Sequence, residues 1–238
     1  MIIFLIFFGP ISVSLGKYNL PQNLDSLGRV AMAKSLGFGS ALKMNADPVP
    51  LGGYDGFQVS MSRDYIDMGN LGGKGVGGSE DSYLASNSIM FGKGFYFDFD
   101  AFFQMTTPQS EDFSSYGSII RGRLYSFEGI PLVLGGLIHG SLSQASNLFG
   151  SNIFGYDLYL FSELSQFILF AGGGQARGTH RFIGGSAGLT GEAQDLEVDL
   201  LASHVWGGIS YRYERWVVSG LTEVYFEPIY SVKIGYKL

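Results

Sequence analysis

The last nine residues of the chain alternate strictly between apolar and polar side chains. The even positions hold Tyr230, Val232, Ile234, Tyr236 and Leu238, and the odd positions hold Ser231, Lys233, Gly235 and Lys237. Successive side chains of a β-strand point to opposite faces of the sheet. The alternation therefore predicts a strand with one apolar, aromatic face and one polar face.

The same period of two recurs from Gly56 to the end of the chain and predicts about ten strands. Their ranges are 56–66, 86–92, 94–105, 115–127, 131–142, 152–162, 166–177, 199–214, 216–226 and 229–238. Short connections alternate with longer ones at 67–85, 106–114, 143–151 and 178–198, and the short connection at 227–229 is the exception. Membrane barrels have short periplasmic turns and longer extracellular loops. We therefore expect an all-β fold: a transmembrane, antiparallel, up-and-down β-barrel over residues 56–238.

The C-terminal strand resembles the closing strand of bacterial outer-membrane β-barrel proteins, which ends on an apolar residue after this alternation. The resemblance implies that the protein sits in the bacterial outer membrane and contacts its lipids. It also implies that the C-terminal strand is recognised by the barrel-assembly machinery. The resemblance is to a class of proteins and names no activity.

The N-terminal region differs in pattern from the rest of the chain. Ile2 to Phe8 form an apolar run, too short for a spanning helix of about 20 residues. With the small residues Ser14 and Gly16 it predicts a signal peptide over residues 1–16, although the basic start of such peptides is missing; a buried N-terminal strand is the alternative. Helical spacing over 21–37 predicts that residues 17–55 form a helical segment that plugs the lumen.

Two short patterns in this region resemble the start of the fatty-acid-transporter family of outer-membrane barrels. They are Gly37-Phe-Gly-Ser-Ala41 and Ala46-Asp47-Pro48. The Asn-Pro-Ala-Gly that follows in that family is absent here.

Alternation alone does not say which face meets lipid, because a soluble lipocalin-like barrel would point its apolar face inward. A row of bulky apolar residues favours lipid: Phe95, Phe97, Phe99, Ala101, Phe103 and Met105. Trp216 and Phe226 share a face ten residues apart, roughly 25 Å along the membrane normal for a tilted strand, which matches the lipid-facing band. With Tyr230 and Tyr236 they are predicted to form an aromatic girdle.

Charged residues on the opposite faces can neutralise one another inside the barrel. A register that pairs Asp98 with Arg123 also pairs Asp100 with Arg121, and a three-residue turn at Glu227–Ile229 would place Glu223 opposite Lys233. An Arg or Lys that faces lipid at mid-membrane costs about 2–4 kcal/mol. The predicted lumen-facing charge network consists of Asp98, Asp100, Arg121, Arg123, Arg212, Glu223 and Lys233.

Composition narrows the classes of function. Charged residues make up 15% of the chain, against roughly 25% in ordinary soluble domains. The net charge of −6 argues against nucleic acid as a partner, because phosphate binding requires a basic surface. The chain has no cysteine, which excludes disulfides and thiolate metal sites.

Candidate chemistry is sparse. His139 and Ser141 share one strand face and resemble the H-x-S pair of outer-membrane lipid A deacylases, but no acid partner is evident. His180 and His204 lack ligand spacing, so we expect no metal, no cofactor, no catalytic residue and no enzymatic activity. Ten strands leave little lumen space once bulky inward residues are placed: Phe102, Tyr125, Tyr159, Arg212 and Tyr225.

We therefore expect an integral outer-membrane barrel, small and largely plugged, with a structural or surface-interaction role. Residues 67–85 and 178–198 would form its contact surface. The alternative is a transporter or narrow channel for small or apolar solutes, gated by the N-terminal segment. A lipid-modifying hydrolase is a second, less favoured alternative.

Overall fold

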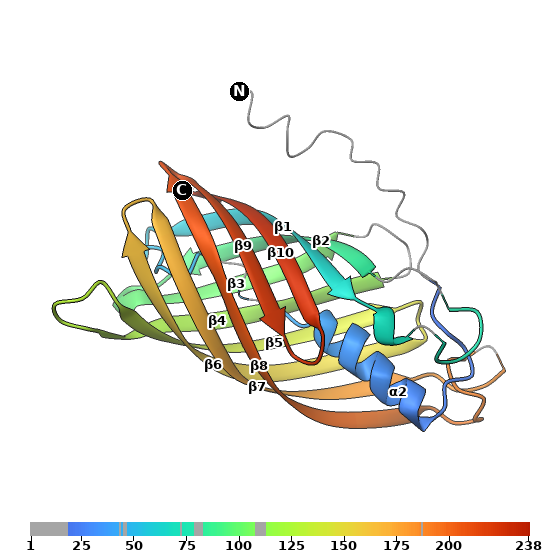
Figure 1. The fold of residues 1–238 in the computed structure, drawn as a ribbon. Helices are drawn as coiled ribbons and strands as arrows, with labels where there is room; N and C mark the ends of the chain where they lie inside the picture. Colours follow the sequence, from blue (N-terminus) through green and yellow to red (C-terminus); the bar gives the residue numbers. More distant parts are fainter. Residues whose placement is uncertain are drawn as a thin grey trace.

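Ten antiparallel strands close into a single barrel, as predicted (Figure 1). The computed structural model describes residues 19–42, 44, 47–71, 73–78, 83–107, 113–186 and 188–238. Each strand pairs with its neighbours in sequence, and β10 closes the barrel against β1. The predicted signal peptide, residues 1–16, lies outside the described residues.

The strands and helical turns have the following bounds. The strands are β1 (Phe57–Asp67), β2 (Tyr83–Gly94), β3 (Phe99–Thr107), β4 (Phe113–Ser126), β5 (Val133–Ala145), β6 (Phe149–Leu164), β7 (Phe167–Phe182), β8 (Leu196–Tyr213), β9 (Trp216–Val224) and β10 (Pro228–Lys237). The helical elements are α2 (Ser26–Met32), η1 (Ala33–Phe38), η2 (Gly69–Leu71) and η3 (Tyr96–Asp98). Among the described residues, no helix has the length and apolar character needed to span a bilayer.

The two ends of the barrel differ in their connections. We call the end with connections 68–82, 108–112 and 183–195 the loop end, and the end with 95–98, 127–132, 165–166 and 214–215 the turn end. Outer-membrane barrels carry their longer loops outside the cell. The loop end is therefore extracellular and the turn end periplasmic.

Side chains alternate between a buried inner face and an exposed outer face. On β10, Tyr230 and Val232 are exposed, whereas Ser231 and Lys233 are buried. Large apolar side chains are exposed on many strands, among them Phe91, Phe103, Ile120, Ile138, Leu158, Leu169, Leu201 and Ile209. A soluble protein rarely exposes so much contiguous apolar surface. The outer face is therefore the lipid-facing one.

One wall of the barrel is taller than the other. β6, β7 and β8 have 16, 16 and 18 residues, whereas β9 and β10 have 9 and 10. A membrane-spanning strand needs about 9–11 residues. Outward polar residues begin at the paired row Tyr156–Gln175–Ser203, continue with Arg177 between Phe154 and Leu201, and make up the whole row Asn152–Thr179–Asp199. The loop-end part of β5–β8 therefore stands above the lipid; we call it the projecting wall.

The predicted loop at 143–151 is wrong, because β5 and β6 continue through most of it. Only residues 146–148 form a turn, and Ser146 and Asn147 both have positive φ, 50° and 55°. Two successive residues with positive φ form a type I′ turn, closed by the hydrogen bond from the Leu148 N–H to the Ala145 carbonyl at 2.9 Å, and the twist of such a turn matches that of the flanking strands. The short turn lets the two strands extend into the projecting wall.

The predicted row of phenylalanines is interrupted. Phe99 and Phe103 face outward on β3, but Phe95 and Phe97 lie in the 95–98 turn, where Phe97 is 89% exposed and has φ 61°. Tyr125 is exposed as well, not inward, because a bulge between Arg123 and Tyr125 shifts the β4–β5 register. Local irregularity at the turn end overrides the alternation in both places.

The predicted register of β9 and β10 is also wrong. Glu223 pairs with Ile229 and Lys233 pairs with Ser219, because the turn is formed by residues 225–227. Proline lacks a backbone N–H and fits the first position of a strand, and Pro228 takes that position in β10. The shift is even, so it preserves which side chains face inward.

Candidate functional site

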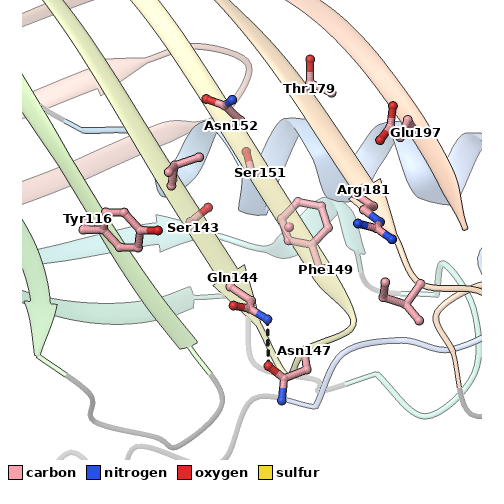
Figure 2. Close-up of a pocket in the computed structure, with 13 residues that line it drawn as sticks. Tyr116, Ser143, Gln144, Asn147, Phe149, Ser151, Asn152, Thr179, Arg181 and Glu197 are labelled. Carbon is pink, nitrogen blue, oxygen red and sulfur yellow. Dashed lines mark hydrogen bonds between the residues drawn. The ribbon is translucent and has the colours of Figure 1, made fainter.

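The outer surface of the projecting wall contains a polar groove. Figure 2 looks onto it with α2 behind the strands. The groove has a volume of about 400 Å³. Its outward polar side chains are Tyr116, Gln144, Asn147, Asn152, Thr179, Arg181 and Glu197, and its lining also includes Leu142, Phe149, Gly150 and Ile183. Ser143 and Ser151 line it too, but their hydroxyls face Ser40 and His180 inside the barrel. The groove therefore offers donors and acceptors with little net charge beside apolar surface.

Ion pairs hold the loop next to this groove. Arg181 donates to Asp195 at 2.6 Å, and the backbone N–H of Gly184 donates to the same carboxylate at 3.1 Å. These two hydrogen bonds lower the pKa of Asp195 below its ordinary value, and the one from Arg181 has the larger effect. The carboxylate therefore stays ionised, and the 183–195 loop is attached to the top of β7.

The N-terminal segment enters the barrel at the loop end. Gln22 bridges to Val76, and the N–H of Leu24 donates to the Leu189 carbonyl at 2.8 Å. Asp25 then caps α2 by accepting from the Gly28 N–H at 2.7 Å. The first described residues thus join two extracellular loops before the chain turns into the lumen.

The helical part of the segment fills the loop-end half of the lumen. Met32, Leu36 and Phe38 are at most 1% exposed and belong to a cluster with residues of β1, β6 and β7. A Cβ added at Gly37 would lie 2.4 Å from the His180 ring, so only glycine permits this approach. The helix and the barrel wall are therefore packed directly against each other.

Below the helix, serines join the segment to the wall. Ser40 and Ser143 lie 2.8 Å apart through their Oγ atoms, and the Leu42 N–H donates to Ser141 Oγ at 3.4 Å. Ser141 is thus buried under the segment. Asp157 Oδ1 lies 4.0 Å from His139 Nε2, which supplies the acid partner that the sequence did not reveal. Burial of Ser141 argues against its use as a nucleophile on membrane lipids.

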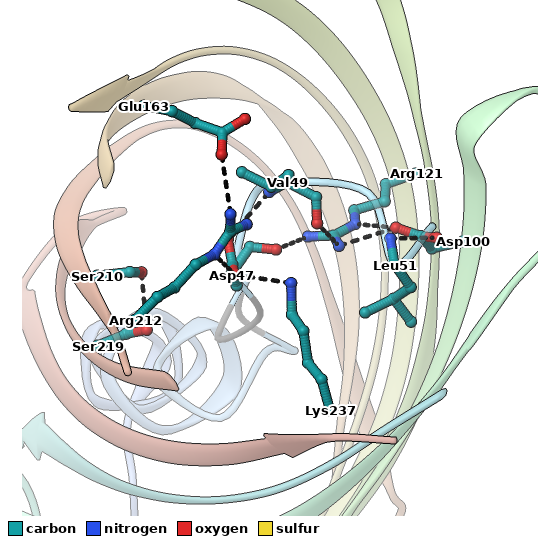
Figure 3. A network of polar contacts seen from close by, with 10 residues as sticks. All are labelled: Asp47, Val49, Leu51, Asp100, Arg121, Glu163, Ser210, Arg212, Ser219 and Lys237. Atoms are coloured by element: carbon teal, nitrogen blue, oxygen red, sulfur yellow. Dashed lines mark hydrogen bonds and ion pairs between the residues drawn. The ribbon is translucent and has the colours of Figure 1, made fainter. Parts of the chain in front are cut away.

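An ion network surrounds Asp47 at the turn end (Figure 3). Arg212 donates to both carboxylate oxygens of Asp47, at 2.6 and 3.0 Å, and Lys237 lies 2.9 Å from it. Arg212 also donates to Glu163 at 2.8 Å. Asp47 has no exposed surface. Side chains from β8 and β10 therefore hold one residue of the N-terminal segment, and Glu163 of β6 contacts only Arg212.

Arg121 connects the wall to the same segment. It donates twice to Asp100, at 3.0 and 2.8 Å, and also to the backbone carbonyls of Asp47 and Val49. Asp100 in turn accepts from the Leu51 N–H at 3.2 Å. Arg121 and Asp100 are 2% and 1% exposed. The predicted register of β3 and β4 is correct, and the pair it creates holds residues 47–51.

The other predicted charge positions separate into different environments. Asp98 and Arg123 form an ion pair, but at the exposed turn end and not in the lumen. Lys233 is buried in the lumen, and Glu223 lies beside His204, 3.6 Å away, far from its predicted partner.

The predicted aromatic girdle is partly displaced. Trp216 and Tyr236 pack against each other on the outer face with ring centroids 4.9 Å apart, and Tyr230 is exposed near the loop end. Phe226 instead lies in the 225–227 turn, where it contacts Phe38 and Lys34 of the N-terminal segment. β9 ends at Val224, so the alternation that predicted a lipid-facing Phe226 does not extend that far.

A buried polar cluster was missed by the sequence analysis. His139, Asp157 and His204 have possible ligand atoms within 4.8 Å of one another, and Glu223 adjoins His204. The four residues come from β5, β6, β8 and β9. No spacing along the chain reveals such a group, because only the register of all these strands brings it together.

No protein-family model matches the sequence, and no curated protein matches it. Similar solved structures include the attachment invasion locus protein Ail of Yersinia pestis, with a TM-score of 0.32, 10% identity and coverage of 77% of this chain and 97% of Ail. The N-terminal β-barrel domain of OprF from Pseudomonas aeruginosa has a TM-score of 0.32 and 10% identity over 78% and 99% of the two chains. Neisserial surface protein A has a TM-score of 0.28 and 10% identity over 77% and 95%.

The class of the protein follows from its own architecture. Each strand of the closed barrel is hydrogen-bonded to two neighbours, the outer face carries many large apolar side chains, and Asp100, Arg121 and Lys233 are buried inside. These are the properties of an integral outer-membrane β-barrel. The resemblance of residues 37–48 to fatty-acid transporters stays a prediction.

Proposed function

We propose that this protein is a plugged, non-enzymatic outer-membrane barrel that acts as a cell-surface interaction protein. The projecting wall, with the loops 68–78 and 183–195, is its contact surface. The partner contributes neutral hydrogen-bonding groups, such as the hydroxyls of a surface glycan. Transport through the lumen is the alternative, and the filled interior argues against it.

The filled lumen is the observation that carries this proposal. Residues 24–51 contact the wall at both ends, through the apolar cluster around Phe38 and through the network around Asp47. A segment held at both ends leaves the outer surface as the part of the molecule available to partners. The polar groove lies on that surface, above the lipid boundary.

Single-channel conductance tests the plugged state. We expect the full chain in planar bilayers to show no steady open state, because opening would require disruption of buried contacts at both ends. A variant that lacks residues 19–50 should conduct if the barrel closes without them. A stable conductance of the intact chain would favour the transporter alternative.

Binding to immobilised glycans tests the contact surface. In a glycan array probed with the detergent-solubilised full chain, Asn152→Trp should abolish binding, because the indole fills the groove. Ile138→Trp, which adds the same ring to the lipid-facing belt, should leave binding unchanged. Equal binding by both variants would contradict the groove as the contact surface.

A further inference from the structure

The polar cluster on β5, β6, β8 and β9 has the composition of a metal site. His139, Asp157, His204 and Glu223 supply two imidazoles and two carboxylates, and each residue is at most 5% exposed. Imidazole and carboxylate together are donors that zinc takes in proteins. Among the described residues, His139, Asp157 and His204 form the one group with this convergence.

The ligand atoms of His139, Asp157 and His204 lie within 4.8 Å of one another, and Glu223, which is close to His204 alone, would join a tetrahedral ion after a side-chain rotation. His204 Nε2 lies 3.0 Å from Asp157 Oδ1 and 3.6 Å from Glu223 Oε1. His139 Nε2 lies 4.0 Å from Asp157 Oδ1. Zinc bonds of about 2.0–2.2 Å in a tetrahedron separate ligand atoms by roughly 3.3–3.6 Å. The observed separations lie on both sides of that value.

His139 provides an independent indication of a ligand. The side chain is buried, and neither ring nitrogen has a hydrogen-bond partner among the described residues. Buried polar atoms are nearly always paired, because leaving them unpaired is costly. An ion between His139 Nε2 and Asp157 Oδ1 would satisfy the imidazole.

The surroundings orient the ligand atoms. Trp206 Nε1 donates to Asp157 Oδ2 at 3.1 Å, which leaves Oδ1 facing the histidines. Such a hydrogen bond from a neighbouring residue fixes the orientation of a metal-binding carboxylate. The His204 ring also packs against Tyr225, with centroids 4.2 Å apart.

Glycines leave the space that these ligand atoms occupy. A Cβ at Gly174 would lie 2.2 Å from Asp157 Oδ1, and one at Gly155 would lie 2.3 Å from His139 Nε2. Gly174 pairs with Asp157 on one side and with His204 on the other. The absence of a side chain at Gly174 thus leaves room for Asp157 Oδ1, which lies 3.0 Å from His204 Nε2.

We propose that the lumen of this barrel binds one Zn²⁺ ion through His139, Asp157 and His204, with Glu223 as the fourth ligand. The site lies between two apolar clusters, one that includes Tyr225 and one that includes Trp206. The ion joins β5, β6, β8 and β9 from inside the lumen.

Metal content and affinity test this inference. The full chain is refolded in detergent with Zn²⁺, desalted and analysed by mass spectrometry; one zinc per chain is expected. After chelator treatment, titration with Zn²⁺ against a chromogenic chelator gives Kd. His139→Ala and His204→Ala should raise Kd at least tenfold. His180→Ala, which removes another buried lumen histidine, should leave Kd unchanged.

Glycine variants test the geometry without removing a ligand. Gly155→Ala, whose added Cβ would lie 2.3 Å from His139 Nε2, should raise Kd at least tenfold, whereas Gly220→Ala, where an added Cβ meets nothing within 4 Å, should not. Should ligand variants fail to fold, Co²⁺ added to the wild-type chain should give the visible absorption of a tetrahedral site. Absence of stoichiometric zinc, absence of that absorption, or an equal loss in His180→Ala would overturn the inference.

Discussion

The two halves of the N-terminal segment are held in the lumen by different interactions, apolar packing in one half and ion pairs with hydrogen bonds in the other. In the loop-end half, Leu36 and Phe38 pack into an apolar cluster. In the turn-end half, residues 47–51 are held by Arg121, Arg212 and their partners. The helical part places apolar side chains on one face, and that face packs against the barrel wall. The irregular stretch offers backbone carbonyls and one carboxylate instead. Each half is therefore fixed by the groups it can offer.

The comparison also explains where charge is tolerated inside the barrel. Arg121 is buried, but Asp100 and two backbone carbonyls accept its hydrogen bonds. A buried charge is stable only when its partners are complete. Loss of one partner should therefore be more damaging in the charged half than loss of packing in the apolar half.

Removal of Arg121 should have the largest effect. Arg121→Ala leaves Asp100 buried without its cation, and we expect a loss of about 3–5 kcal/mol in the free energy of unfolding. Urea denaturation in detergent, followed by tryptophan fluorescence, measures it. Arg123→Ala removes the exposed pair and should cost no more than about 1 kcal/mol. Equal losses would contradict the distinction between buried and exposed pairs.

Truncation in the apolar half should come next. Phe38→Ala removes a fully buried ring from between His180, Tyr225 and Phe226. We expect a loss of about 3–4 kcal/mol, independent of salt because no charge is involved. Phe38→Leu, which retains much of the volume, should lose less. A loss below about 1 kcal/mol for Phe38→Ala would mean that the helix does not pack as described.

Neutralising the anchor at the turn end should have a moderate effect. Asp47→Asn weakens hydrogen bonds from Arg212 and the ion pair with Lys237, and we expect a loss of about 1.5–3 kcal/mol. Brief conducting events should also appear in planar bilayers as the segment loosens. Glu163→Gln, on the exposed side of Arg212, is the matched control and should change neither quantity appreciably. A loss of stability in Glu163→Gln but not in Asp47→Asn would contradict the assignment of Asp47 as the anchor.

The smallest effect concerns the 183–195 loop. The lowered pKa of Asp195 means that its stabilising contribution is present above the ordinary aspartate pKa, near 3.9, and is lost as the pH falls through the lower pKa of the folded state. The protection factor of the Gly184 amide, which is the intrinsic exchange rate at each pH divided by the observed rate, should fall at acid pH and in Asp195→Asn at neutral pH. A protection factor unchanged in both cases would show that the pairing does not hold the loop.

Much of the barrel wall could be predicted from the sequence. Side chains alternate along a strand, so once one residue is known to face inward, the orientation of all the others in that strand follows. Asp100 and Arg121 were found in this way. The period does not determine where a strand turns, so Phe95, Phe97 and Phe226 were placed on faces that end before them. Any even shift of register also keeps every side chain on its predicted face, and a shift of four residues misplaced Glu223 relative to Lys233.

The interior contents could not be predicted for a different reason. Asp47 lies in an irregular stretch with no periodicity, and its partners come from β8 and β10. The cluster around Asp157 requires the correct register across several strands at once. Both features form only when the barrel closes and brings distant strands together. Local sequence patterns do not contain this information.

The position of the segment inside the lumen can be measured with an engineered cross-link. The chain has no cysteine, and the Oγ atoms of Ser40 and Ser143 lie 2.8 Å apart. Ser40→Cys with Ser143→Cys should form a disulfide in the intact outer membrane, seen as a mobility shift without reductant. Ser210→Cys with Ser219→Cys, a pair within the wall at the same 2.8 Å, is the positive control. A disulfide in the wall pair but free thiols at 40 and 143 would contradict a segment held inside the barrel.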